Sequence, residues 1–332
     1  MDSPRSSPHW ICAAALLAAL WLGVPPLTRA AGGEPAASAA PHSTICPAAA
    51  LCFFAVGDTG TGEPPQREVA AAIAAKCRAA GCRFGLLLGD VIYEHGVTSP
   101  ADPQFAAKLE RPYAGLAAPF YAVLGNHDYD GTTWSQGDHY LAYAGGHPNF
   151  LMPGLSYAFE AGPALFLALD TQPLIRGHGR AEREQGALVD EALLRSRLPW
   201  RIAFGHHPYV SNGVHGTAGR YDHCLVPIGA LCGGRLKRFT EAHLCGKVDL
   251  YLSGHDHSRQ VLQDVVSCPG TTFVVSGAGA KVSELPGTHP ARFQQASLGF
   301  AYVRVTVDAL DLEMLDASGA VQFRLELNRP AR

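Results

Sequence analysis

Five short segments of the chain join glycine to aspartate, asparagine or histidine, which are side chains that bind metal ions. The segments are Gly57–Gly60 (GDTG), Gly89–Tyr93 (GDVIY), Gly125–Asp128 (GNHD), Gly205–Pro208 (GHHP) and Gly254–His257 (GHDH). Carboxylate, amide and imidazole donors without thiolate suit Fe, Mn, Zn or Co. They are too many for one tetrahedral ion but enough for two ions that share a carboxylate, which is the arrangement used for in-line displacement at phosphorus. The pattern predicts a binuclear metal site for phosphoryl chemistry.

All five segments follow short apolar runs that are typical of buried strands. Strands are expected at Leu51–Val56, Phe84–Leu88, Phe120–Leu124, Leu165–Leu169, Arg201–Phe204 and Val248–Leu252, with helices at Pro64–Ala80 and Ala181–Arg197. This alternation predicts an α/β fold. Ligands of such sheets bind beyond the carboxyl ends of the strands, and glycine lets the backbone turn sharply there. We therefore expect the five segments to meet in one place.

Beyond Arg259 the chain changes character, with strand-like runs, turn residues and little helix. This part predicts a second sheet that packs with the first in a single domain. The run Val275–Lys281 (VSGAGAK) is interpreted as a strand end rather than a nucleotide site. Gly57–Gly62 (GDTGTG) lacks the lysine of a P-loop, and its aspartate would repel a phosphate in the absence of a metal.

The N-terminus has the order of a secretory signal peptide. Trp10–Val24 is an uncharged apolar run of about 15 residues, shorter than the ~20 that span a bilayer. We predict a signal peptide over 1–30, a flexible linker over 31–48 and one catalytic domain over 49–328. An uncleaved anchor is the alternative. Cleavage near Ala30 would give a secreted or periplasmic protein with no stable membrane span.

Composition and cysteine usage narrow the class of protein further. The chain has 332 residues, of which 47% are hydrophobic and 17% charged, so it can bury a large core. Lys and Arg total 26 against 29 Asp and Glu, a balance that argues against nucleic-acid binding. Of the 9 cysteines, Cys12 would leave with the signal. An even set in an exported chain favours disulfides, for which Cys46–Cys52, Cys77–Cys82 and Cys224–Cys232 are candidate pairs with no connectivity fixed.

The ordered set GDTG, GDVIY, GNHD, GHHP and GHDH resembles the calcineurin-like metallophosphoesterases. The tyrosine of GDVIY extends the resemblance to the purple acid phosphatases, and in particular to their small, tartrate-resistant form. The stretches 205–216, 251–257, 274–279 and 299–303 are similar to that form as well, so the resemblance runs from Phe53 to Leu327. It implies two packed mixed β-sheets flanked by helices.

The resemblance also implies the role of each donor. Asp58, Asp90, Tyr93 and His257 would hold Fe(III), and Asp90 would bridge to a divalent Fe, Zn or Mn held by Asn126, His206 and His255. His127 and His215 match catalytic histidines that contact the phosphate or protonate the leaving group. The implied enzyme is a monomeric acid phosphatase in which a metal-bound hydroxide attacks phosphate monoesters. Its substrates would be small phosphate esters, with phosphoproteins as further candidates.

Some features depart from this family pattern or leave other interpretations open. His207 stands where the family often has an aromatic residue, as an additional phosphate contact or as a spectator. The Asp222–Cys245 segment is longer and richer in glycine, so substrate preference does not transfer. Asn126 could cap a turn instead of binding a metal. The competing functions are a phosphodiesterase of the same superfamily, a Mn- or Zn-loaded enzyme without Tyr93 as ligand, and a non-catalytic metal- or phosphate-binding protein.

Overall fold

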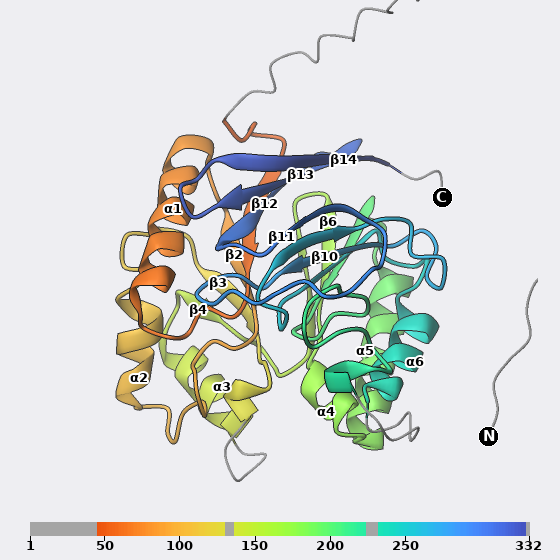
Figure 1. The fold of residues 1–332 in the computed structure, drawn as a ribbon, viewed down its shortest axis with the longest axis horizontal. Coiled ribbons are helices and arrows are strands. Elements are labelled where there is room, and N and C mark those ends of the chain that lie inside the picture. Colours follow the sequence, from red (N-terminus) through yellow and green to blue (C-terminus); the bar gives the residue numbers. More distant parts are fainter. Residues whose placement is uncertain (1–44, 130–135, 224–231, 330–332) are drawn as a thin grey trace, which may run out of the picture. The chain divides into compact units, whose positions relative to one another are not determined.

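Two mixed β-sheets form the centre of the computed structural model, which describes residues 45–129, 136–223 and 232–329 (Figure 1). The first sheet has the order β14-β13-β12-β1-β2-β3-β4 and the second β11-β9-β10-β8-β7-β6-β5. Strands of the first sheet are β1 (Leu51–Val56), β2 (Phe84–Leu88), β3 (Phe120–Val123), β4 (Phe150–Leu151), β12 (Gly299–Val305), β13 (Ala309–Asp316) and β14 (Val321–Asn328). Strands of the second are β5 (Tyr157–Ala161), β6 (Ala164–Ala168), β7 (Trp200–Phe204), β8 (Leu250–Ser253), β9 (Arg259–Leu262), β10 (Thr272–Ser276) and β11 (Ala291–Gln295).

Each sheet has a parallel part that carries the glycine-rich segments. In the first sheet β1, β2, β3 and β4 are parallel, and β12 continues it antiparallel to β1. In the second, β6, β7, β8 and β10 are parallel, with β5 and β9 antiparallel at either side. The carboxyl ends of the parallel strands are thus the places where the predicted donors follow.

Helices flank both sheets. They are α1 (Pro64–Ala80), α2 (Pro103–Phe105), α3 (Gln136–Gly146), α4 (Thr171–Ile175), α5 (Gly179–Arg195) and α6 (Gly234–His243), with a π-helical turn η1 (Ala106–Glu110) and 3-10 turns η2 (His127–Tyr129) and η3 (Tyr221–His223). Figure 1 shows α1 to α3 beside the first sheet and α4 to α6 beside the second. Among the described residues, no helix is both long and apolar enough to cross a membrane.

Side-chain alternation along β6 explains how the layers join. Phe166 and Ala168 point into the core between the sheets, whereas Leu165 and Leu167 point into a second core with residues of α5 and α6. Between the sheets, the Phe53 and Phe166 rings meet edge to face with their centroids 5.3 Å apart. The indole of Trp200 donates to the carbonyl of Thr306 at 2.7 Å, which ties β7 to the end of β12.

The expected α/β fold of two packed mixed sheets is confirmed, and the predicted helix and strand boundaries agree within two residues. One expectation needs correction, because the strands after Arg259 do not form a sheet of their own. β9, β10 and β11 extend the second sheet, and β12, β13 and β14 extend the first. Both parallel parts have an open edge that needs a partner, and apolar runs in the sequence do not tell which edge a strand joins.

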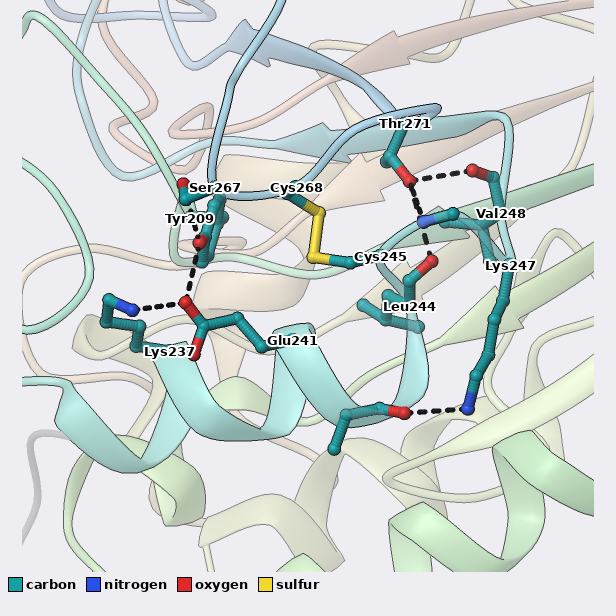
Figure 2. The surroundings of a disulfide bond; sticks show 12 residues. Tyr209, Lys237, Glu241, Leu244, Cys245, Lys247, Val248, Ser267, Cys268 and Thr271 are labelled. Carbon is teal, nitrogen blue, oxygen red and sulfur yellow. Dashed lines mark hydrogen bonds and ion pairs between the residues drawn. A yellow bond between two sulfur atoms is a disulfide. The ribbon is translucent and has the colours of Figure 1, made fainter.

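Three disulfides join described cysteines. Cys46–Cys52 and Cys77–Cys82 match candidate pairs from the sequence. Cys224 of the third candidate pair lies outside the described residues. Cys245–Cys268 was not expected; it joins the turn after α6 to the loop before β10 (Figure 2). In the same view the Tyr209 hydroxyl donates to Glu241 at 3.0 Å, which ties the loop after β7 to α6.

Candidate metal centre

The seven predicted metal donors lie just beyond the carboxyl ends of five strands. Asp58 follows β1, Asp90 and Tyr93 follow β2, Asn126 follows β3, His206 follows β7, and His255 and His257 follow β8. The first three strands belong to one sheet and the last two to the other. The donors therefore meet at the seam between the sheets.

Glycine allows the two sheets to approach at this seam. A Cβ atom on Gly254 would lie 2.5 Å from Oδ2 of Asp58, and one on Gly57 would lie 3.1 Å from the Cα of Gly254. Three donors that directly follow a glycine have unusual backbone conformations, with φ of 58° at Asp58, 50° at Asp90 and 68° at His255. Left-handed conformations of residues other than glycine are uncommon and cluster at functional sites.

One group of donors surrounds the Tyr93 hydroxyl. Its oxygen lies 3.1 Å from Oδ1 of Asp58 and 3.1 Å from Nε2 of His257. Asp58 Oδ1 and His257 Nε2 are themselves 3.6 Å apart. The three side chains come from different strands, yet their donor atoms face a common point.

A second group surrounds Nε2 of His206. This nitrogen lies 3.0 Å from Oδ1 of Asn126, 3.2 Å from Nδ1 of His255 and 3.4 Å from Oδ1 of Asp90. The Nδ1–H of His206 donates to the carbonyl of Leu88 at 2.8 Å, so Nε2 carries a lone pair. The amide oxygen of Asn126 also offers a lone pair. A cation between these atoms would resolve their mutual repulsion.

These distances fit metal coordination. Donors about 2.1 Å from one ion lie roughly 3.0–3.4 Å apart when the angles between them are ~90–109°. The two groups are also adjacent, since ligand atoms of Asp58, Asp90 and His206 all lie within 4.8 Å of one another. The geometry can hold one ion in each of the two groups.

The electrostatics of the seam favour cations. Asp58 and Asp90 are 0% and 1% exposed, so two carboxylates lie in the interior. Burial, together with the charge of Asp90, raises the pKa of Asp58 well above its usual value. Burial lowers the pKa of His206 and of His255, which keeps both imidazoles neutral and able to ligate. Bound cations would favour the carboxylates in their charged form.

The two predicted catalytic histidines lie at the rim of this centre. The backbone N–H of His127 donates to Oδ1 of Asp90 at 3.0 Å, and its Nδ1 contacts the carbonyl of Glu94 at 2.7 Å. The ring of His215 stacks on that of His255, with centroids 4.3 Å apart. Both rings are partly exposed, with side-chain exposures of 28% and 33%. They are therefore accessible to a ligand that enters from solvent.

His207 lies deeper than the sequence suggested. It is buried, its Nδ1 is 2.8 Å from the Thr171 hydroxyl, and its ring centroid lies 4.5 Å from that of His255. His207 also offers a ring nitrogen near those of His206 and His255, and the three ligand atoms lie within 4.8 Å of one another. In the Asp222–Cys245 segment, residues 224–231 lie outside the described part, and Gly234–His243 forms α6.

Sequence reasoning missed three residues that support the donors. The Asp128 carboxylate accepts the backbone N–H groups of Val91, Ile92 and Gly125. Asp256, between His255 and His257, accepts the backbone N–H of His215 at 2.9 Å. Lys281 lies over the Tyr93 ring with its Nζ 3.7 Å from the centroid. Asp128 lies in the GNHD motif and Asp256 in the GHDH motif, so their place among the donors is the sequence signal for their role. No sequence pattern indicates Lys281.

Comparisons with known proteins complete the description of the site. The family model described as "Calcineurin-like phosphoesterase" matches residues 53–259 of the chain. The chain is 30% identical to "Tartrate-resistant acid phosphatase type 5" of Sus scrofa, over 88% of this chain and 91% of the relative. It is 28% identical to "Purple acid phosphatase 4" of Arabidopsis thaliana, over 82% of each chain. Among solved structures, "GAP50 the anchor in the inner membrane complex of Plasmodium" superposes with a TM-score of 0.68 at 19% identity, over 86% of this chain and 90% of that one; this likeness concerns the fold.

Proposed function

The chain belongs to the calcineurin-like phosphoesterases and is a binuclear-metal acid phosphatase related to the purple acid phosphatases, and from this premise we propose which of its residues carry the reaction. The observation that supports the assignment is the convergence of seven donors into two adjacent groups, one around the Tyr93 hydroxyl and one around Nε2 of His206.

In the proposed centre, Tyr93, Asp58, His257 and Asp90 would hold Fe(III). A phenolate and two carboxylates are hard anionic donors that suit a trivalent ion. Asn126, His206 and His255 would hold a divalent Fe, Zn or Mn, for which Asp90 would be a further ligand. Their neutral donors suit the lower charge. When bound, the two ions would activate a water and neutralise charge on the phosphate oxygens.

The protein's own residues orient and complete the reaction. The Leu88 carbonyl fixes the tautomer of His206. His127 is fixed through its backbone contact with Asp90 and through Nδ1, and His215 lies over His255, so both rim imidazoles can reach the phosphate ester. They would contact the phosphate oxygens and donate a proton to the leaving oxygen. The products are inorganic phosphate and an alcohol.

A visible absorption spectrum and a metal analysis of one purified sample test this proposal. A tyrosinate-to-iron charge-transfer band with about two metals per chain is the expected result. Rates on phosphate monoesters and diesters, measured on the same sample, should favour the monoesters. A colourless protein with two Mn or Zn would overturn the iron assignment, and faster diester cleavage would make the chain a phosphodiesterase. Bound metal without phosphate release would indicate a non-catalytic protein.

We also propose that the protein is exported. The signal-like segment 1–30 and the 31–48 linker lie largely outside the described residues, and the catalytic domain extends over 49–328. Support comes from the three disulfides, which form and persist in oxidising compartments. Secretion and the periplasm are both compatible with this composition.

A further inference from the structure

Asp222 contacts the rim histidine His215 although it is not one of the donors of the metal centre. Its Oδ1 lies 2.7 Å from Nδ1 of His215. The backbone N–H of Asp222 also donates to the carbonyl oxygen of His215 at 2.9 Å. The two residues are thus joined through both side chain and main chain.

The turn between them brings Asp222 back to His215. Asp222 has a left-handed backbone with φ of 52°, a conformation that aspartate adopts more readily than most residues. The neighbouring Tyr221 is buried, and its hydroxyl donates to the carbonyl of Pro208. Its backbone N–H donates to the carbonyl of Cys232 at 3.3 Å. The main chain on the N-terminal side of Asp222 is therefore anchored, although the carboxylate itself is 69% exposed.

His215 is held from two other directions as well. Its backbone N–H donates to the carboxylate of the buried Asp256, and its ring stacks on His255 with the two ring centroids 4.3 Å apart. With Nδ1 turned to the carboxylate of Asp222, the nitrogen left to face a ligand is Nε2. A histidine whose Nδ1–H is bonded to a carboxylate has one ring orientation, as in known catalytic pairs of this kind.

We propose that Asp222 is a positioning residue for leaving-group protonation, because its carboxylate orients the His215 ring so that Nε2 faces the phosphate ester. This inference rests on the proposed function. As the water oxygen bonds to phosphorus, the bond between phosphorus and the ester oxygen breaks. A proton on Nε2 of His215 passes to that oxygen, which leaves as the alcohol. The attacking water releases a proton to solvent, and solvent returns a proton to Nε2.

The dependence of rate on the leaving group tests this role. A good leaving group such as p-nitrophenolate needs little protonation, whereas an alkoxide needs it most. In Asp222→Asn, kcat/KM for an alkyl phosphate should fall about 10- to 100-fold, and for p-nitrophenyl phosphate only about twofold. His215→Asn should show the same selectivity with a larger loss, and adding Asp222→Asn to it should cost little more.

A matched control comes from a second aspartate–histidine pair in the protein. Asp190 accepts from Nδ1 of His243 at 3.1 Å, and its side chain is 53% exposed. Asp190→Asn should leave all rates unchanged. Metal content and the visible spectrum of Asp222→Asn should equal those of the wild type, which separates ring positioning from loss of the centre.

Three outcomes would overturn the inference. An equal loss on every ester would mean that Asp222 shapes binding or folding rather than proton donation. Additive effects in the double variant would mean that Asp222 does not act through His215. A metal-loaded wild type that hydrolyses no ester would instead overturn the proposed function, and this inference with it.

Discussion

At the scale of single residues, the Tyr93 hydroxyl connects the iron assignment to a visible signal. Its oxygen is 3.1 Å from both Asp58 Oδ1 and His257 Nε2. Tyr93→Phe removes one donor without opening a large cavity, since the ring is retained. We expect the charge-transfer band to vanish and the iron content to fall, as measured by absorption and metal analysis.

Tyr157→Phe is the control for this change. Tyr157 is buried as well, and its hydroxyl donates to the carbonyl of Ala122 at 2.9 Å. Its loss should cost about 1 kcal/mol of stability and leave the colour intact. An intact band in Tyr93→Phe would show that the phenolate is not a ligand.

Asp170 provides a residue-scale prediction about pH. Burial raises its pKa to about 7, and its Oδ2 accepts the Tyr129 hydroxyl at 2.8 Å. Because the folded state retains this proton where the unfolded state has lost it, stability falls as pH rises from about 4 to 7. The free energy of unfolding of Asp170→Asn, relative to that of the wild type, should rise by up to about 4 kcal/mol between about pH 4.5 and pH 7.5. Urea unfolding at each pH measures this difference.

Asp102→Asn separates this effect from general titration. Although burial opposes it, hydrogen bonds from Thr98 and Gln104 lower the pKa of Asp102. That carboxyl is charged in both states across the same pH interval. The free energy of unfolding of Asp102→Asn should therefore differ from that of the wild type by the same amount at every pH in this interval. A pH-independent difference for Asp170→Asn would refute the prediction.

At the scale of elements, the Asp128 carboxylate connects two strand ends that carry donors. It accepts the backbone N–H groups of Val91 and Ile92 at 3.0 Å and of Gly125 at 2.9 Å, and the Tyr140 hydroxyl at 2.7 Å. Replacement by alanine leaves buried donors without a partner. We expect a loss of about 3 kcal/mol or more of unfolding free energy, together with weaker metal retention during dialysis.

Tyr140→Phe removes only one of these bonds and is the control for Asp128→Ala. It should cost about 1–2 kcal/mol and leave metal retention near that of wild type. Equal metal loss in both variants would show that destabilisation alone releases the ions. Normal retention in Asp128→Ala would show that the strand ends keep their positions without the carboxylate.

Strands and helices of this fold were largely predictable because local pattern determines them. Buried apolar runs mark β1, β2 and β7, and the prolines before an alanine-rich stretch mark the start of α1. The convergence of the donors followed from their position after strands. Their roles as ligands stay predictions, and His207 shows why: its burial and its contact with Thr171 depend on the packing of distant segments.

At the scale of the whole molecule, sequence pattern alone could not assign the C-terminal strands to their sheets. Nothing in the runs of β10 and β12 tells that one joins β8 and the other β1. The same holds for Cys245–Cys268, which are 23 residues apart and joined only because α6 and the loop before β10 fold together. Such pairings depend on long-range geometry.

That disulfide supports a prediction about overall stability. It closes a longer loop than Cys46–Cys52, whose members are 6 residues apart, and the entropy lost by the unfolded chain grows with loop length. Replacing Cys245 and Cys268 together by serine should cost about 3 kcal/mol, against about 2 kcal/mol for Cys46 and Cys52. Urea unfolding of the metal-loaded variants measures both. A larger loss for the short loop would mean that local packing around each bridge, and not the entropy of the unfolded chain, determines its contribution.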